Sequence, residues 1–249
     1  MSGVLLVTNP TSGGSDEDTI EGLEGAIRGL GDVATVAPPS RGAFDDEVRA
    51  AADDAAFVVV AGGDGTFNCT INALGHELDR FVFGLVPMGT GNDLARTLGL
   101  PLDAREAARL ILEGDERLVD VSRARGRGVE RLFVNACMGG FPVEVDEAIE
   151  GDVKRRLGPL AFWFGGAKAA ARLERTTVKM NGIEVPDCVA VGVGNGRTCG
   201  GGLCVWPDAV PDDGLLDGCA LPAANHAAAM RLIARVKACS HHELEEVKT

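Results

Sequence analysis

The hydrophobic residues in the first half of the chain form short apolar runs separated by amphipathic stretches. The short runs are rich in β-branched residues, as in strands that are buried on both faces of a parallel sheet; they cover residues 3–8, 33–37, 57–61 and 82–86. Between them, apolar residues recur every three or four positions, which predicts helices, with the clearest patterns at residues 15–30, 44–54, 66–74 and 104–113. Strands that alternate with helices in this way need right-handed crossovers. The pattern therefore predicts an α/β fold with a three-layer parallel sheet.

The pattern changes after residue 116. Apolar runs now follow one another with few helical stretches between them, and they predict strands at residues 117–123, 132–136, 176–180, 183–185, 188–194 and 215–221. Asn181-Gly182 is a strong signal for a two-residue hairpin turn. Helices are predicted only at residues 159–173 and 224–239. We therefore expect an α/β domain at residues 1–116 and a mainly β, sandwich-like domain at residues 117–249.

Glycine-rich turns follow two of the predicted strands. Residues 62–65 read Gly-Gly-Asp-Gly after one strand, and residues 87–91 form a second turn, after which Asn92 is expected to cap the next helix. Carboxyl ends of parallel strands share one edge of the sheet, where nucleotides bind. Backbone N–H groups at such turns can hold a phosphate, provided that no Cβ keeps the anion away. The two turns together predict a nucleotide-binding site.

The residues in and around these turns resemble the diacylglycerol kinase catalytic domain family, which includes sphingosine kinases and bacterial lipid kinases. GGDGT at residues 62–66 is shared with NAD kinases and, in similar form, with phosphofructokinases, whereas GTGND followed by an arginine is characteristic of the lipid kinase branch. Further similar segments are NPTSGG, FVNACMGGF, NGRTCGGG and PDAVPDDGLLD, so that the resemblance extends from residue 9 to about residue 220. It implies an ATP-binding cleft between the two predicted domains.

The resemblance also implies which residues meet the nucleotide. Asn9 is expected to face it, although a simple Asx turn would equally explain an asparagine there. Ser40 is the nearest candidate for a nucleotide contact that family members make after the second strand, and Gly14 stands where many of them have a basic residue. The complete predicted set comprises Asn9, Ser40, Gly62, Gly63, Asp64, Gly65, Thr66, Asn68, Gly89, Thr90, Gly91, Asn92 and Arg96.

Phosphoryl transfer needs alignment of the reactants and neutralisation of the phosphate charge. A metal ion held by carboxylates can supply that neutralisation, so the acidic residues of the turns are the catalytic candidates. Asp64 and Asp93 project from the two turns and are the predicted catalytic residues, holding Mg²⁺ beside the γ-phosphate. The alternative is that each accepts N–H bonds within its own turn. By resemblance, a separate structural Mg²⁺ would be held by Asp213 and the backbone carbonyls of Val210 and Leu215; an acidic turn without metal is the alternative.

The C-terminal segment departs from the family pattern. The bacterial lipid kinases have a late Asp-Gly-Glu segment, whose glutamate is the proposed general base, and closing strands that complete the β domain. Neither is found after the helix at residues 224–239, so no general base is assigned and the second domain is expected to be incomplete, with an exposed edge strand. We expect the glutamates at 243, 245 and 246 to form a solvated acidic end; the alternative is that one of them replaces the general base if the tail folds back over the cleft. Little or no lipid kinase activity is expected from this chain, with ATP binding retained.

The composition limits partners and location. The net charge of −13 and a pI near 4.7 argue against nucleic acid as a partner. Acidity with few lysines is typical of proteins that work in high salt, but an ordinary acidic cytosolic protein has the same property. No signal peptide or apolar membrane span is visible, which predicts a cytoplasmic protein. The 7 cysteines are scattered, and we expect them to be reduced and mostly buried, without a zinc site.

The sequence thus favours an ATP- and Mg²⁺-dependent lipid kinase of phospholipid biosynthesis. Its acceptor would be diacylglycerol or a related lipid, met at the inner surface of the membrane by a peripheral protein, and a homodimer is left open. One alternative is a truncated homologue that binds nucleotide or lipid without turnover. The other is a kinase for a soluble substrate such as NAD, which the GTGND motif disfavours. The aromatic cluster Phe162, Trp163 and Phe164 is either core or a wall for an acyl chain.

Overall fold

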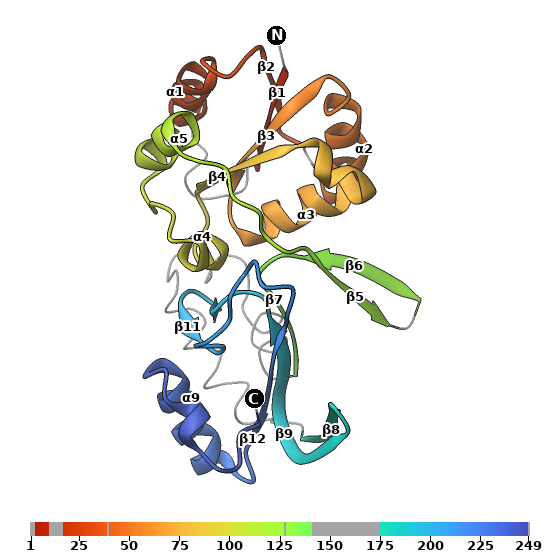
Figure 1. Cartoon of the computed structure of the whole chain (residues 1–249), viewed down its shortest axis with the longest axis vertical. Helices are drawn as coiled ribbons and strands as arrows, with labels where there is room; N and C mark the ends of the chain where they lie inside the picture. Colours follow the sequence, from red (N-terminus) through yellow and green to blue (C-terminus); the bar gives the residue numbers. More distant parts are fainter. Residues whose placement is uncertain (1–2, 10–16, 39, 127, 141–174, 249) are drawn as a thin grey trace. The chain divides into compact units, whose positions relative to one another are not determined.

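The computed structural model describes residues 3–9, 17–38, 40–126, 128–140 and 175–248 (Figure 1). Within it, the chain divides into two compact units, Met1–Phe133 and Val134–Thr249, and each is treated by itself below. The predicted helix at residues 159–173, its aromatic cluster Phe162–Phe164 and the residues of the NPTSGG turn after Asn9 lie outside the described residues.

The first unit is built on a four-stranded parallel sheet. Its strands are β1 (Gly3–Thr8), β2 (Val33–Val36), β3 (Ala55–Gly62) and β4 (Val82–Pro87), in the order β2-β1-β3-β4. Val4 of β1 lies opposite Val33 on one side and Phe57 on the other. The carboxyl ends of β3 and β4 therefore meet at the same edge, which confirms the predicted parallel sheet.

Helices cover both faces of this sheet (Figure 1). α1 (Glu17–Ile27) and α5 (Ala104–Glu113) lie on one face, while α2 (Arg41–Ala51) and α3 (Asp64–Leu74) lie on the other. On the α1 face, the buried side chains of Leu23 and Ile27 pack with Val4, Leu6 and Val59. The short helix η1 (Gly75–Arg80) follows α3, and α4 (Asp93–Leu98) follows β4. The predicted three-layer arrangement is confirmed.

A hairpin completes the first unit. It consists of β5 (Ser122–Gly126) and β6 (Val129–Phe133), which pair antiparallel. The predicted strand at residues 117–123 is wrong over most of its length, because residues 117–121 have no regular structure and Arg117 donates to the carbonyl of Leu98. The side-chain amide of Asn72 holds the hairpin to α3 through Leu132. The first unit therefore extends well beyond residue 116.

The second unit contains an antiparallel sheet with the order β12-β9-β7, and β8 pairs with β9. Its strands are β7 (Ala136–Gly140), β8 (Thr176–Met180), β9 (Ile183–Gly194) and β12 (Asp217–Pro222), and β10 (Thr198–Cys199) pairs with β11 (Leu203–Cys204). Asn181 and Gly182 both have positive φ, as the predicted hairpin turn requires. α9 (His226–Lys237) and η3 (His241–Glu243) follow. A mainly antiparallel second part was predicted, and this is confirmed.

The last residues of the chain pack against the second unit. The backbone N–H and C=O of Lys248 both bond to Ala220 of β12, at 3.3 and 2.8 Å. Val247 is buried in the same apolar cluster as Leu232 and Val236 of α9. Glu243 and Glu246 form ion pairs with arginines of α9. Glu243, Glu245 and Glu246 are exposed, which confirms the predicted solvated acidic end, while the buried Val247 and the two backbone hydrogen bonds of Lys248 anchor this segment beside β12.

The cysteines differ from the expectation that all are reduced and most are buried. Cys204 and Cys239 form a disulfide with Cα atoms 5.1 Å apart, which joins β11 to the end of α9. Of the free cysteines, Cys188 and Cys219 are buried and the other three are half-buried. Burial raises the pKa of Cys219 to about 12, so its thiol stays protonated at neutral pH.

Two findings concern metals and membranes. Within the described ranges, no group of three or more His, Cys, Asp or Glu side chains is placed to hold a metal ion. Among the helices that the structure describes, none is long and apolar enough to cross a membrane.

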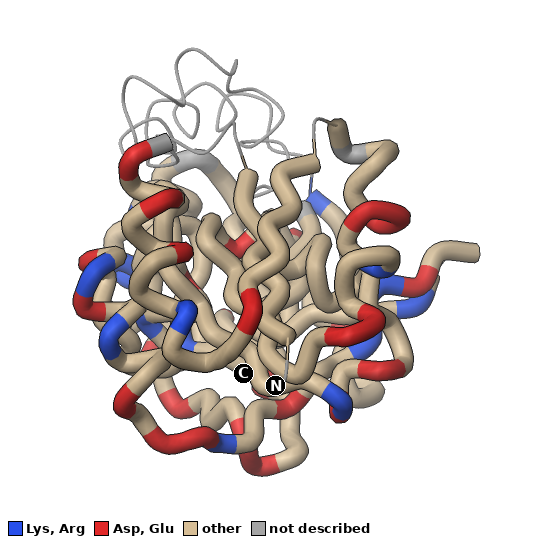
Figure 2. The backbone as a smooth tube through the Cα atoms, turned by 90° about the horizontal axis from the view of Figure 1, so that it is seen from above, with Lys and Arg blue, Asp and Glu red and all other residues tan. Residues whose placement is uncertain are grey.

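The excess of acidic residues predicts a salt-dependent stability. Figure 2 shows acidic positions spread over the described backbone, with basic positions between them, and the net charge is −13. Like charges destabilise a compact state, and salt screens them, with a Debye length of about 3 Å at 1 M. We expect the melting temperature to rise by several degrees as KCl increases from 20 mM to 1 M, as measured by circular dichroism. A flat or falling melting temperature would show that charge repulsion is unimportant here.

Candidate functional site

The two glycine turns lie against each other at the carboxyl edge of the parallel sheet. The N–H of Met88, which follows β4, donates to the carbonyl of Gly62 at the end of β3 with a distance of 3.0 Å. A Cβ placed on Gly89 would lie only 2.5 Å from the Cα of Gly63, and one on Gly63 would lie 3.0 Å from the Cα of Gly89. Side chains at either position would force the turns apart. Both glycines are therefore explained by this contact.

The carboxylate of Asp64 connects the first turn to the helix that follows the second. Its Oδ2 accepts from the N–H of Asp93 at 3.0 Å, and its Oδ1 accepts from the N–H of Leu94 at 2.8 Å. These are the first N–H groups of α4, which have no partner within the helix. Asp64 thus accepts backbone N–H bonds from the opposite turn, an arrangement that neither sequence-based interpretation of this residue contained.

Asn92 closes the second turn instead of capping α4. Its backbone has a φ of 52°, in the left-handed region, and its side chain makes no cap hydrogen bond. The side-chain Oδ1 accepts from the N–H of Gly89 at 2.9 Å, and Nδ2 donates to the carbonyl of Gly89 at 2.7 Å. Asn92 thus occupies the predicted N-cap position of α4, but its side chain does not cap the helix, because Asp64 satisfies the first N–H groups.

Two carboxylates are concentrated at this edge. Asp64 is half-buried and Asp93 is buried. Burial is the largest cause that raises the pKa of Asp64, the neighbouring charge of Asp93 raises it further, and the hydrogen bonds from Leu94 and Asp93 act in the opposite direction. A cation near both groups would relieve the repulsion between them.

Gly65 has a different environment from the other glycines of the turns. A Cβ at this position would have no atom within 4 Å, and its φ lies outside the left-handed region. The residue is exposed in the first turn of α3. Neither packing nor backbone conformation within the described protein requires a glycine here. Open space beside the N-terminus of a helix is where an anion can approach the backbone.

Asn9 and Thr66 link the first strand to the same region. The side-chain Nδ2 of Asn9, directly after β1, donates to Oγ1 of the buried Thr66 at 3.5 Å. A Cβ on Gly62 would lie 2.7 Å from that of Thr66. The ends of β1, β3 and β4 thus contribute side chains to one cluster, as their shared edge predicts.

The remaining predicted nucleotide-binding residues have varied positions. Nε of Arg96 donates to the carbonyl of Gly91 at 3.1 Å, so the arginine folds back on the second turn, where Thr90 is exposed. Ser40 caps α2, because its Oγ accepts from the N–H of Ala43 at 3.4 Å. Asn68 lines a cavity on another side of α3. The structure therefore brings together the residues of the two turns with Asn9, while Ser40 and Asn68 lie in other surroundings.

The predicted second cation site lies in the loop before β12. Oδ1 of Asp213 accepts from the N–H of Leu215 at 2.9 Å, and Val210 and Leu215 are exposed. Burial raises the pKa of Asp217, and the charges of Asp213 and Asp208 raise it further. The loop is thus an acidic turn, closed by the side chain of Asp213, with several carboxylates close enough to repel one another.

Comparison with families of known proteins covers both units. Residues 3–124 match the diacylglycerol kinase catalytic domain, and residues 136–249 match the YegS C-terminal NAD kinase beta sandwich-like domain. A Stenotrophomonas maltophilia protein named "Probable lipid kinase YegS-like" is 33% identical over 98% of this chain and 81% of its own length. A protein of the same name from Xanthomonas oryzae pv. oryzae is 36% identical over 80% of this chain and 67% of its own length.

Solved structures show the same fold. A crystal structure of a diacylglycerol kinase from Bacillus anthracis superposes with a TM-score of 0.70 at 26% identity, and covers 94% of this chain and 78% of that one. A second structure from the same organism, assigned to the same kind of kinase, gives a TM-score of 0.79 at 28% identity and covers 99% of this chain and 81% of that one.

Proposed function

Since this chain belongs to the YegS-like lipid kinase family, with a diacylglycerol kinase catalytic domain, we propose that it transfers the γ-phosphate of ATP to a lipid hydroxyl. Diacylglycerol or a related lipid is the proposed acceptor. The acceptor would be reached at the inner membrane surface, by a cytoplasmic protein in peripheral contact with it. The role would lie in phospholipid biosynthesis.

The contact between the two glycine turns supports this proposal most strongly. It places the N-terminus of α3, where backbone N–H groups beside the exposed Gly65 can attract phosphate, next to the second turn at the same edge of the sheet. The space beside Gly65 is open. Thr66 directly follows Gly65, and the side chain of Asn9, at the end of β1, donates to the Thr66 hydroxyl. The arrangement can hold a polyphosphate between two rigid turns.

Asp64 and Asp93 fit a divalent cation. Mg²⁺ in kinases is usually held by one or two carboxylates together with phosphate oxygens and water. Burial raises the pKa of Asp64 and the charge of Asp93 raises it further, and such an ion would relieve the repulsion between the two carboxylates. When bound, Mg²⁺ would neutralise charge on the transferred phosphoryl group. In its absence, Asp64 still fixes the start of α4 through the N–H groups of Asp93 and Leu94.

The other predicted residues have supporting roles in this proposal. The guanidinium of Arg96 lies at the second glycine turn, where it donates to the Gly91 carbonyl. On ATP binding it would leave this carbonyl and donate to the phosphates instead. In the second unit, Asp213 with the backbone carbonyls of Val210 and Leu215 would hold a structural cation. The negative charges of Asp213 and Asp208, which help to raise the pKa of the partly buried Asp217, favour a cation there. We assign no proton acceptor for the lipid hydroxyl among the described residues.

Lipid phosphorylation can be tested directly with the 249-residue protein. Because no proton acceptor is assigned, we expect slow turnover, carried by alignment and metal alone. ATP and Mg²⁺ should convert a small but detectable fraction of diacylglycerol in mixed micelles to phosphatidic acid, measured by mass spectrometry, with a lipid extract screened in parallel for other acceptors. The Gly65→Val protein is the control for a contaminating kinase. If ATP binds to the wild type but no lipid in the extract gains a phosphate, the proposed function is wrong.

A further inference from the structure

One disulfide joins two segments of the second unit that the proposed function does not use. Cys204 belongs to β11, and Cys239 follows the C-cap of α9, 35 residues later. Both residues are half-buried, so small thiols have access to the bond. Cys188 and Cys219 of the same unit are buried and lie outside the disulfide. Accessible disulfides are the ones that thiols reduce most readily.

The strand that carries Cys204 belongs to a small hairpin. β10 pairs with β11 at two positions, Thr198 with Cys204 and Cys199 with Leu203. The loop between the strands is Gly200-Gly201-Gly202, and all three glycines have positive φ. A two-stranded hairpin is marginally stable by itself. The disulfide therefore anchors a hairpin that has little pairing of its own.

The other half of the disulfide has an unusual backbone conformation. Cys239 has a φ of 54°, in the left-handed region, at a position after a helix where glycine is usual. Its N–H donates to the carbonyl of Val236, and the N–H of Ser240 donates to that of Arg235, as in a Schellman motif. A residue with a Cβ stays in this conformation only where its surroundings hold it there. The bond to Cys204 is one such constraint.

A hydrogen bond connects the same two segments beside the disulfide. His241 is fully buried, and its Nε2 donates to the carbonyl of Val205 at 2.9 Å. Burial lowers the pKa of His241, so the ring is neutral at pH 7 and Nδ1 carries a lone pair. Nδ1 has no hydrogen-bond partner among the described residues. Water would satisfy this atom if the two segments separated, and the disulfide opposes that separation.

The contact of residues 204–205 with residues 239–241 is called the junction below. Contacts farther along both segments do not depend on it. The side chain of Asn135 donates to the carbonyl of Thr198 at 2.8 Å, and Lys248 bonds to Ala220 through both backbone groups. Breaking the disulfide should therefore open the junction locally and leave the unit folded.

We propose that the Cys204–Cys239 disulfide is a reversible redox switch that opens and closes this junction. For reduction, the thiolate of one glutathione attacks a sulfur of the disulfide and forms a mixed disulfide, and one protein thiol is released. A second glutathione attacks the mixed disulfide, which releases the other protein thiol and glutathione disulfide. The two glutathione molecules thus supply two electrons and two protons, and the reverse reactions close the junction. The switch is independent of the lipid kinase activity proposed above.

Equilibration with glutathione tests whether the bond is reversible. The protein would be held in buffers that range from reduced to oxidised glutathione, and native thiols would be alkylated with iodoacetamide and located by mass spectrometry. We expect Cys204 and Cys239 to change together from disulfide to alkylated thiols. The buried Cys188 and Cys219 should stay unmodified at every ratio, because the unit remains folded. A disulfide that persists in reduced glutathione, or does not re-form in oxidised glutathione, would overturn the proposal.

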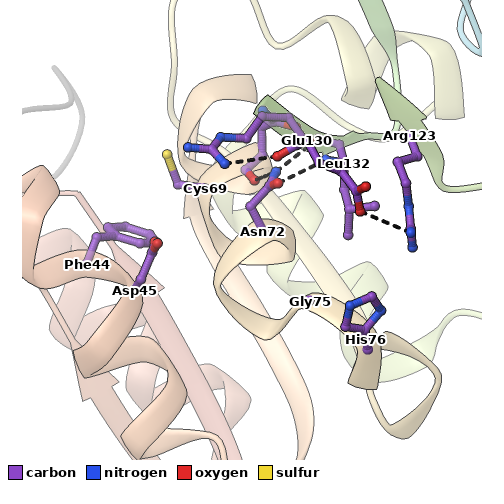
Figure 3. Close-up of a pocket in the computed structure, with 11 residues that line it drawn as sticks. Phe44, Asp45, Cys69, Asn72, Gly75, His76, Arg123, Glu130 and Leu132 are labelled. Atoms are coloured by element: carbon purple, nitrogen blue, oxygen red, sulfur yellow. Dashed lines mark hydrogen bonds and ion pairs between the residues drawn. The ribbon is translucent and has the colours of Figure 1, made fainter. Parts of the chain in front are cut away.

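Hydrogen exchange followed by mass spectrometry tests whether the bond controls the junction. We expect reduction to speed exchange severalfold in peptides that cover residues 203–206 and 239–244. Peptides that contain Leu132 of the first unit are the reference, because its N–H donates to Asn72 of α3 (Figure 3) and should exchange equally in both states. Unchanged exchange at the junction after complete reduction would show that the disulfide is no switch.

Two variants separate the disulfide from the hairpin that carries it. Cys204→Ser should show fast exchange at the junction at every glutathione ratio, as the reduced wild type does. Cys199→Ser is the matched control, since Cys199 lies in the same hairpin but outside the disulfide. It should keep the full response to glutathione, and loss of that response would contradict the assignment. The wild-type measurements decide the question even if Cys204→Ser does not fold.

Discussion

Replacing Gly65 by valine is expected to abolish ATP binding while the protein remains folded. The position is exposed, and a Cβ there meets no protein atom within 4 Å. The branched side chain would therefore fill only the open space beside the N-terminus of α3, where we place the phosphates. ATP affinity should be measured by isothermal titration calorimetry, and folding by circular dichroism and thermal unfolding.

Gly25→Val is a matched control for this substitution. Gly25 is also an exposed helical glycine with no atom within 4 Å of a built Cβ, but it lies in α1, away from the turns. We expect its ATP affinity to equal that of the wild type. Unchanged affinity in Gly65→Val would show that the first turn is purely structural. Equal loss in both variants would mean that valine in a helix disturbs the unit generally.

Replacing Asp64 by asparagine is expected to lower lipid kinase turnover by orders of magnitude and also to destabilise the first unit. The charge that would face Mg²⁺ is lost, which removes transition-state stabilisation. An amide has only one oxygen, so it cannot accept from both Asp93 and Leu94 as the carboxylate does. An N–H left without its partner costs about 1–3 kcal/mol. Turnover and urea unfolding are the two measurements.

Asp103→Asn is a control that separates the loss of turnover from the loss of stability. Asp103 caps α5, where its Oδ1 accepts from the N–H groups of Arg105 and Glu106 at 3.0 Å each. The same chemical change at this exposed cap should alter stability slightly and leave turnover intact. If Asp64→Asn loses stability but keeps full turnover, Asp64 is a helix cap and has no catalytic role.

The parallel sheet and its glycine turns could be predicted because their signals are local. Each apolar run coincides with one strand, of which the edge strand β2 alone has no buried residue, and each turn directly follows its own strand. The contacts that organise the site are not local. Asp64 reaches N–H groups 29 and 30 residues later, and Asn72 pairs with a strand 60 residues later. Such pairs leave no periodic trace in a single sequence.

Misplaced strands in the second unit have a similar cause. Pro186 and Asp187 predict a break because proline lacks an N–H group, yet β9 continues through them from Ile183 to Gly194. Asp187 adopts a φ of 55°, and the register against β8 shifts at this point. The break is thus a bulge within one strand, which only the pairing with neighbours reveals.

The close contact between Gly63 and Gly89 also limits how this protein can be redesigned. A Cβ on either glycine would collide with the backbone of the other. A larger residue at one position therefore cannot be accommodated by changing the side chain at the other. Substitutions at the two positions should therefore show strong epistasis, and neither turn can diversify independently. A chimera that takes one turn from a different kinase needs the matching turn from the same donor. For recombination experiments, residues 62–65 and 87–94 are best exchanged as a single module.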